Sequence, residues 1–368
     1  MARPAVDFGT EAFLDLLDGC LAEVNDLMGN GSGRIVGYTS SGHGAWEATV
    51  TNLFDIGDRV LLCDTGLFSA KWGEMCEAQG LEVTRLVTGE RHGVDPTVLA
   101  ELLAADADHR IAGVLVCHTE TSTGITSDLG AVRRALDGLG HPALLVVDAI
   151  ASFATTPLDA SAVGADAILA ASQKGLMMPV GLSFSGISPR AVERSYANGR
   201  HRFYWDWRRR LEAEGYRKFC GTPPIHHLFA LRAALDLIAA EGGLEAVVGR
   251  HRRLAEAVRI AVEHWSKLGA LELNALDPDQ RADSVTCVRV GDGIDADRVV
   301  TIARERFDVT LGSGVGSLAG RSFRIGHLGD LNTPMVLGAL GGIEASLRHA
   351  GVPIGSGALD AAAEHLAR

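Results

Sequence analysis

An amphipathic helix is the first element that the pattern of apolar and polar residues predicts. From Glu11 to Leu27 the apolar side chains recur every three or four positions, which places them on one helix face. These residues are Phe13, Leu14, Leu17, Leu21, Val24 and Leu27. The segment from Asn30 to Gly33 ends the helix, so we expect residues 1–30 to form an N-terminal helical arm.

Short strands that alternate with helices are predicted over the next two hundred or so residues. The strands are expected at 34–39, 59–63, 81–86, 111–117, 143–147 and 167–170. The helices between them are expected at 45–54, 68–79, 95–104 and 129–139. Strands that read as continuous apolar runs and alternate with helices are typical of a mostly parallel sheet covered on both faces. We therefore predict a large α/β domain over residues 31–244.

A smaller α+β domain is predicted over residues 245–368. Long helices at 230–240 and 244–268 connect it to the large domain. Its remaining elements are expected to be strands at 271–275, 284–290 and 323–325, and helices at 295–304 and 334–349.

The composition is that of a folded, acidic protein. Of 368 residues, 47% are apolar, 22% are charged and 44 are glycine, which predicts a globular chain with tight loops. The net charge of −12 disfavours nucleic acid and anionic membranes as partners. Six widely spaced cysteines without a CxxC pair indicate reduced thiols. Without a basic and apolar leader or an apolar run of bilayer length, we expect a cytoplasmic protein.

Lys174 is the first candidate for chemistry. It follows the predicted strand at 167–170 and is surrounded by small and apolar residues. A lysine in such a place can lose its charge through desolvation, and its amine then suits the formation of a Schiff base. The alternative is an ordinary lysine in a surface loop.

Asp148 provides a second reason to consider the same edge of the sheet. It ends the apolar run 144–147, so its carboxylate should emerge at the carboxyl end of a parallel strand, where open α/β sheets bind ligands. An aspartate there can keep the ring nitrogen of pyridoxal phosphate protonated, which makes the ring an electron sink. An acid at a strand end is common, but Asp148 together with Lys174 is a more specific signal than either residue.

A phosphate cradle is predicted between the strand at 34–39 and the helix at 45–54. Its residues are Ser41, Gly42, His43 and Gly44. Free backbone N–H groups at the positive end of a helix can hold an anion, although a Gly-Ser turn before a helix is also an ordinary connection. Neither a Walker pattern nor GxGxxG is present, which disfavours nucleotides.

Arg324 lies inside the apolar strand predicted at 323–325. A guanidinium in such a place needs a partner. The α-carboxylate of a substrate and an internal Asp or Glu are equally good candidates.

Several motifs in order along the chain, from about residue 7 to about residue 349, resemble one enzyme family. They are Ser40–Glu47, Gly57–Leu61, Glu120–Gly124, Val146–Asp148, Ser172–Leu176, Tyr204–Trp207 and Phe323–Asp330. Together they resemble the class V aminotransferases of fold type I, which depend on pyridoxal 5′-phosphate, and more narrowly the serine-glyoxylate and alanine-glyoxylate aminotransferases.

The resemblance implies a role for each site residue. Lys174 would form the Schiff base with the cofactor, Asp148 would pair with the pyridine nitrogen, and Arg324 would take the substrate carboxylate. The remaining cofactor contacts that it implies are Gly42, His43 and Gln173 at the phosphate, Thr121 near the phenolic oxygen, Phe68 stacked on the ring, and Thr222 at the phosphate of a neighbouring subunit. Shared sites of this kind imply at least a homodimer.

The implied reaction is transamination between a small amino acid, such as serine or alanine, and a small 2-oxo acid, most simply glyoxylate. Phe8, Gly9 and Gly221 depart from the family pattern, so a specialised amino donor is an alternative. A lyase or aldolase is another, but a desulfurase needs a reactive cysteine near Arg324, and the stretch 313–322 contains none. A non-catalytic binding protein would lack Lys174 or Asp148.

A metal site is not expected. His118, His141, His226 and His227 have no carboxylate or thiolate at a ligand spacing beside them, which favours structural or surface roles.

Overall fold

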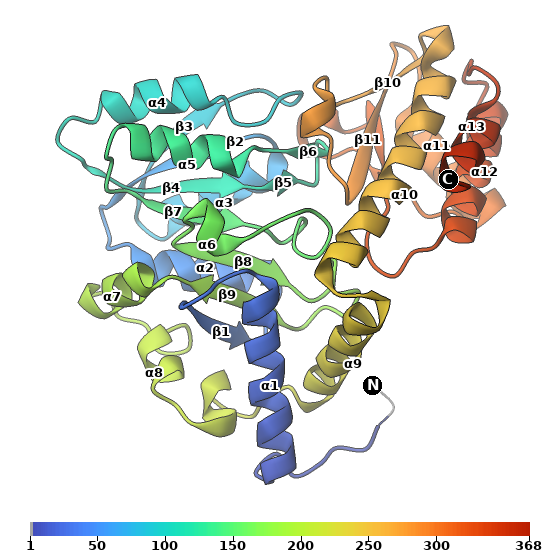
Figure 1. Ribbon diagram of the computed structural model, residues 1–368. Coiled ribbons are helices and arrows are strands. Elements are labelled where there is room, and N and C mark those ends of the chain that lie inside the picture. The colour runs from blue at the N-terminus through green and yellow to red at the C-terminus, as the bar shows by residue number, and fades with distance from the viewer. Residues whose placement is uncertain (1–2) are drawn as a thin grey trace.

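A seven-stranded sheet forms the centre of the computed structural model, which describes residues 3–368 (Figure 1). In spatial order its strands are β1 (Arg34–Tyr38), β9 (Ser183–Ile187), β8 (Ala167–Ala171), β7 (Leu144–Asp148), β4 (Ile111–Cys117), β2 (Arg59–Asp64) and β3 (Glu82–Val87). Neighbouring strands run parallel except at β9, which is antiparallel to both β8 and β1. The predicted α/β class with a mostly parallel sheet is confirmed.

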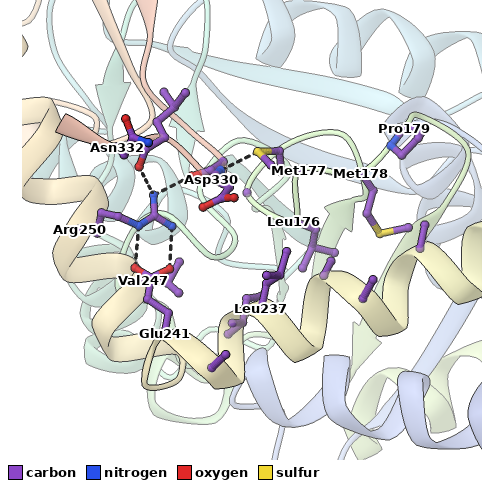
Figure 2. Close-up of a pocket in the computed structure, with 18 of the residues that line it drawn as sticks. Leu176, Met177, Met178, Pro179, Leu237, Glu241, Val247, Arg250, Asp330 and Asn332 are labelled. Atoms are coloured by element: carbon purple, nitrogen blue, oxygen red, sulfur yellow. Dashed lines mark hydrogen bonds and ion pairs between the residues drawn. The ribbon is translucent and has the colours of Figure 1, made fainter. Parts of the chain in front are cut away.

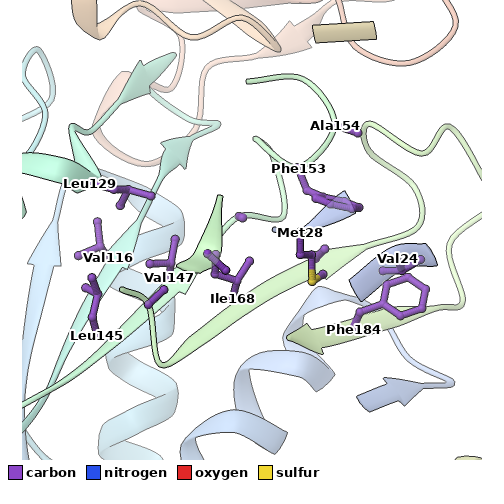
Figure 3. Packing of buried hydrophobic residues seen from close by; sticks show 14 of the residues in the cluster. Val24, Met28, Val116, Leu129, Leu145, Val147, Phe153, Ala154, Ile168 and Phe184 are labelled. Carbon is purple, nitrogen blue, oxygen red and sulfur yellow. The ribbon is translucent and has the colours of Figure 1, made fainter. Parts of the chain in front are cut away.

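Helices cover both faces of this sheet because alternate residues of its strands point in opposite directions. Leu145 and Val147 of β7 pack in one core with α1 (Glu11–Leu27), α4 (Pro96–Ala104), α5 (Leu129–Gly138) and α9 (Ile225–Glu241). Leu144 and Val146 pack in the opposite core with α2 (Gly42–Leu53), α3 (Leu67–Ala78), α7 (Pro189–Ala197) and α8 (Trp207–Leu211). Figure 3 shows part of the first core, in which Leu145 and Val147 lie near Val116 and Ile168.

Some elements of the large sheet region were not predicted. The strand β9 has the sequence Ser-Phe-Ser-Gly-Ile, which has no apolar run, yet all five residues are buried because β9 lies between β8 and β1. The short helices α6 (Ala160–Val163) and α8, as well as α7, were also missed. The helix predicted at 45–54 begins earlier, at Gly42. Two short strands, β5 (Thr119–Glu120) and β6 (Ile125–Thr126), form a hairpin beyond β4.

A four-stranded antiparallel sheet follows the long helix α10 (Leu244–Trp265). Its order is β10 (Leu271–Leu273), β11 (Val285–Val290), β13 (Ser322–Gly326) and β12 (Gly312–Ser313). It packs with α10, α11 (Ala296–Phe307), α12 (Thr333–His349) and α13 (Ala358–Leu366) around a core of its own. In Figure 1 these elements form the orange and red end of the molecule. The limits of the three predicted units, 1–30, 31–244 and 245–368, stay predictions.

The two sheets are joined by hydrogen bonds close to the β5–β6 hairpin. The side-chain amide of Asn274, just after β10, donates to the carbonyl of Thr123 at 2.9 Å. Arg91 binds Glu272 through two hydrogen bonds of 2.9 and 3.1 Å. Within residues 3–368, no helix combines the length and the apolarity that crossing a bilayer requires.

Candidate functional site

Asp148 is the last residue of β7, and its carboxylate is almost completely buried, with 4% of the residue exposed. Its Oδ1 accepts a hydrogen bond from the backbone N–H of Ile150 at 2.7 Å, and its Oδ2 accepts one from Trp46 Nε1 at 2.9 Å. Burial raises the pKa of Asp148 to about 6, because an apolar environment disfavours the charged form, while these two donors lower it. The environment therefore holds an acid that titrates close to neutral pH.

Lys174 lies three residues beyond β8, at the same carboxyl edge of the sheet as Asp148. Burial lowers the pKa of its amine, and the positive charge of Arg324 lowers it further, whereas the charge of Asp148 raises it. An amine with a lowered pKa carries a free electron pair more often at neutral pH, which is what nucleophilic and proton-transfer chemistry requires. The alternative of an ordinary lysine in a surface loop does not fit this half-buried position.

The predicted cradle lies at the N-terminus of α2, which starts at Gly42 directly after Ser41. The first turn of the twelve-residue helix α2 directs its free N–H groups and the positive end of the helix dipole toward this point. Gly42 allows close packing there, because a Cβ atom would collide with the side chain of Ile150. Gln173 faces the same cavity, and its buried Oε1 has no hydrogen-bond partner among the described residues. A polar ligand group is therefore a suitable occupant.

One cavity of about 170 Å³ brings most of the predicted site together. The predicted residues that line it are Ser41, Gly42, His43, Phe68, Thr121, Asp148, Gln173 and Lys174. The lining residues that were not predicted are Trp46, Cys117, Thr119, Ile150 and Ala151. The strand-end argument that pointed to Asp148 applies equally to Cys117, the last residue of β4, and could have found it.

Arg324 lies on β13 of the small sheet and does not line the cavity itself, but it binds Thr121, which does. Its Nη1 donates to the carbonyl of Thr121 at 3.2 Å and its Nε to the carbonyl of Ser313 at 3.1 Å. Both partners are backbone carbonyls, and no Asp or Glu of residues 3–368 lies within ion-pair distance of this guanidinium. Burial lowers the pKa of Arg324, so an anion in the cavity would stabilise its charge.

Thr222 is the one predicted cofactor contact that the structure leaves outside the cavity. It is exposed in the loop between Cys220 and α9. Its predicted role concerns a neighbouring subunit, so its position in a single chain does not test that role.

Each of the four histidines weighed as metal ligands contacts a group of the protein instead. His118 is buried, and its Nδ1 lies 2.9 Å from Ser152 Oγ. Burial lowers the pKa of His118 to about 4, which favours the neutral ring. Among residues 3–368, no three His, Cys, Asp or Glu side chains come together in a way that could hold a metal ion.

The residues that meet at this edge suit pyridoxal phosphate. They supply an amine, a buried acid and an anion cradle at a helix N-terminus, all at the carboxyl ends of parallel strands. The fold and the site together define a pyridoxal-phosphate-dependent enzyme of fold type I.

Comparison with known proteins gives the family. Residues 5–325 match the family described as aminotransferase class-V. An L-aspartate–glyoxylate aminotransferase of Paracoccus denitrificans is 39% identical, over 98% of this chain and 90% of its own length. A serine–glyoxylate aminotransferase of Methylorubrum extorquens is also 39% identical, over 94% of this chain and 86% of its own. The chain belongs to the class V aminotransferases.

A solved structure supports the same conclusion at the level of the fold. The ureidoglycine-glyoxylate aminotransferase of Bacillus subtilis superposes with a TM-score of 0.91 at 26% identity. The superposition covers 100% of this chain and 93% of the other. The family that the motifs resembled, and the fold that it implied, are thus confirmed.

Proposed function

We propose that this protein transfers an amino group from a small amino acid, such as serine or alanine, to glyoxylate. The observation that carries the proposal is the meeting of Lys174 and Asp148 in one cavity, with Arg324 beside them. Names of similar proteins support the acceptor, since the two relatives described above are glyoxylate aminotransferases. Class V membership supports the reaction type.

Each site residue has a task in this reaction. Pyridoxal phosphate, when bound, supplies a ring that accepts the electron pair released when the Cα–H bond of the amino acid breaks. Lys174 Nζ would take that proton and return it, and the Asp148 carboxylate would keep a proton on the ring nitrogen. Gly42, His43 and Gln173, with Ser41, would hold the phosphate, while Phe68 and Thr121 would orient the ring. Arg324 would bind the α-carboxylate of the substrate.

The lining supports a donor without a second carboxylate. Among residues 3–368, the lining contains the amine of Lys174 and no guanidinium. Arg324 lies beside the cavity and is assigned to the α-carboxylate. A second carboxylate in the cavity would therefore need a cation from elsewhere. We accordingly expect serine and alanine to be better donors than aspartate, although the donor named in one of the two relatives is aspartate.

The test is a coupled product analysis. Purified protein with pyridoxal phosphate is mixed with glyoxylate and either serine, alanine or aspartate, and products are quantified by mass spectrometry. Serine should give equal amounts of hydroxypyruvate and glycine, and alanine equal amounts of pyruvate and glycine. Ammonia released from serine without glyoxylate would instead identify a lyase, and no turnover of any donor would contradict transamination.

The cysteines support transamination over desulfurase chemistry. Cys287 pairs with Arg324 across β11 and β13, and burial raises the pKa of its thiol to about 11. Cys117 lines the cavity, but burial raises the pKa of its thiol well above the ordinary value. Neither thiol is ionised at neutral pH, so neither is a good nucleophile.

We also propose a homodimer whose two sites each use residues of both chains. A groove of about 890 Å³ lies between α9 and the loop 175–179 that follows Lys174 (Figure 2). Met177 and Leu237 at this groove are 51% and 58% exposed, which is unusual for such apolar side chains. A second copy of the chain covering this face would bury them, and Thr222 would then serve the neighbouring site.

Mixing two defective variants tests shared sites. Lys174→Ala and Thr222→Ala should each lower activity, and unfolding and refolding a mixture of both should form mixed dimers. Such a dimer contains one site with Lys174 of one chain and Thr222 of the other, so activity should recover in part. Monomers in light scattering, or no recovery from mixed dimers, would contradict the proposal.

The thiols support a reducing compartment such as the cytoplasm, which we propose as the location. All six cysteines are free.

A further inference from the structure

Glu120, in the β5–β6 hairpin, is completely buried and faces the start of α3. Its Oε2 accepts a hydrogen bond from the backbone N–H of Ser69 at 2.9 Å. Its Oε1 accepts two hydrogen bonds from Ser122, one from the backbone N–H at 3.0 Å and one from the hydroxyl at 2.6 Å. Among residues 3–368, no cation lies within ion-pair distance of this carboxylate, although buried carboxylates are usually paired with one. Hydrogen bonds from the chain alone stabilise its position.

These hydrogen bonds hold the chain on both sides of Phe68. Ser69 follows Phe68 and donates to Glu120, and Leu67 precedes it and donates its N–H to Ser122 Oγ at 3.0 Å. The start of α3 lies so close to the hairpin that a Cβ atom at Gly66 would stand 2.7 Å from Glu120 Cγ and 2.6 Å from Ser122 Oγ. The Phe68 backbone therefore cannot shift relative to the hairpin without breaking two hydrogen bonds.

The same carboxylate also sets the position of Thr121. This residue stands between Glu120 and Ser122, which are bound to each other by the two hydrogen bonds at Oε1. The Thr121 carbonyl in turn accepts the hydrogen bond from Arg324 Nη1. One buried acid thus connects the Phe68 ring, the Thr121 hydroxyl and the Arg324 guanidinium.

We propose that Glu120 is a positioning residue that sets the Phe68 ring and Thr121 at the spacing that the bound cofactor requires. This inference rests on the cofactor site described under the proposed function. A carboxylate suits the task because two acceptor oxygens can serve three donors at once. The positive end of the α3 dipole adds to the stability of an anion at Ser69. A glutamine offers one acceptor oxygen and turns its NH₂ group toward a donor.

Glu120→Gln in the full-length protein tests this role. When the side chain can no longer accept hydrogen bonds from both Ser69 and Ser122, Phe68 and Thr121 should shift relative to each other. The dissociation constant for pyridoxal phosphate should rise at least about tenfold, as expected for losing a hydrogen bond to a charged group. The visible circular dichroism of the bound cofactor, which reports how asymmetrically its surroundings hold the ring, should fall in amplitude. The KM for the amino donor should rise, because Arg324 binds Thr121.

Asp166→Asn is the matched control for a purely structural loss. Asp166 is also a buried acid, and its Oδ2 accepts a hydrogen bond from the N–H of Leu145 at 2.9 Å, at the opposite end of β7. The substitution Asp166→Asn should lower the melting temperature of the protein, and it should leave the visible circular dichroism and the cofactor affinity unchanged. If Glu120→Gln behaves like this control, Glu120 is structural and the positioning role is wrong.

Ser122→Ala provides a second variant in case Glu120→Gln does not fold. It removes the hydroxyl that accepts from Leu67 and donates to Glu120, while the carboxylate and its bond to Ser69 stay in place. We expect the same loss of circular dichroism amplitude to a smaller extent, and an unchanged amplitude would overturn the proposal. Failure of the wild-type protein to bind pyridoxal phosphate would instead contradict the cofactor site itself.

Discussion

Asp148 and Lys174 show how burial and charge oppose each other at single residues. Burial favours the neutral form of both side chains, since it raises the pKa of the acid and lowers that of the amine. Each charge stabilises the other, and Trp46 and Ile150 donate to the carboxylate. The balance leaves Asp148 with a pKa of about 6, so its charge depends on pH in a range where the protein can be studied.

The first prediction concerns the pH dependence of cofactor binding. Because burial favours the protonated acid, Asp148 of the cofactor-free protein should keep its proton up to a pH of about 6. Only the carboxylate can hold the ring nitrogen charged, so affinity for pyridoxal phosphate should fall as the pH drops through about 6. Fluorescence titrations of wild type and Asp148→Asn at several pH values measure this. The same dependence in both proteins would show that another group is responsible.

The second prediction concerns Lys174. Replacing it by alanine removes the base that we propose moves the substrate proton, so turnover should fall by about 10³-fold or more. Borohydride, which reduces imines, should attach the cofactor to the wild-type chain and not to Lys174→Ala. The exposed Lys71, paired with Glu74, serves as the control, since Lys71→Ala should leave both properties unchanged. Labelling of Lys174→Ala at wild-type levels would mean that another amine carries the chemistry.

At the scale of elements, the start of α2 and the ends of β4, β7 and β8 create the site together. Parallel strands bring their carboxyl ends to one edge, and α2 returns to that edge with its N-terminus. The side chain of Trp46 from α2 crosses to Asp148 at the end of β7, which binds helix to strand. The geometry of the cavity thus depends on how closely α2 packs on the sheet.

The third prediction tests this packing at Gly42. A methyl group there would collide with Cδ1 at the end of the Ile150 side chain, so this side chain should turn and change the shape of the cavity that it lines. Gly42→Ala should therefore weaken binding of pyridoxal phosphate at least about tenfold by fluorescence titration.

A glycine within α10 is the control for this substitution. Gly249 is exposed and has no atom within 4 Å of where a Cβ would stand, so Gly249→Ala should raise the free energy of unfolding by about 0.5–1 kcal/mol without changing cofactor affinity. Equal cofactor affinity in wild type and Gly42→Ala would show that the packing is not critical.

At the scale of the whole molecule, the site is completed by contact between the two sheets. Arg324 belongs to the small sheet, whereas the cavity belongs to the large one. Asn274 carries one of the connections, because its amide donates to the carbonyls of Thr123 and Glu90. The position of Arg324, to which we assign the substrate carboxylate, therefore depends on contacts away from the cavity.

The fourth prediction concerns Asn274→Ala. Two carbonyls would lose their donor, which should lower the free energy of unfolding by about 1–3 kcal/mol. Because the small sheet carries Arg324, the KM for the amino donor should rise more than the dissociation constant of the cofactor. Asp295→Ala, which removes the cap of α11, should lower stability without changing KM. A parallel rise of KM in both variants would argue against a specific role of Asn274.

The local sequence pattern was sufficient to identify the candidate residues at the ends of strands and at the start of a helix. Asp148 and Lys174 follow apolar runs, and Ser41 and Gly42 lie at the start of a helix, so strand and helix periodicity was enough to place them. The α/β class followed from the same alternation. The motifs added Phe68, Thr121 and Gln173, which periodicity could not have singled out, and the cavity contains all three.

Contacts between distant segments were decided only by the tertiary structure. Trp46 is 102 positions from Asp148, Arg324 is 203 positions from Thr121, and Glu120 is 51 positions from Ser69. The strand β9 is buried by its neighbours although three of its five residues are serine or glycine. Local spacing reports which face of an element is apolar, while the partner of a buried polar group depends on the path of the whole chain. For that reason the sequence indicated which residues form the candidate site, and the fold decided how they are held.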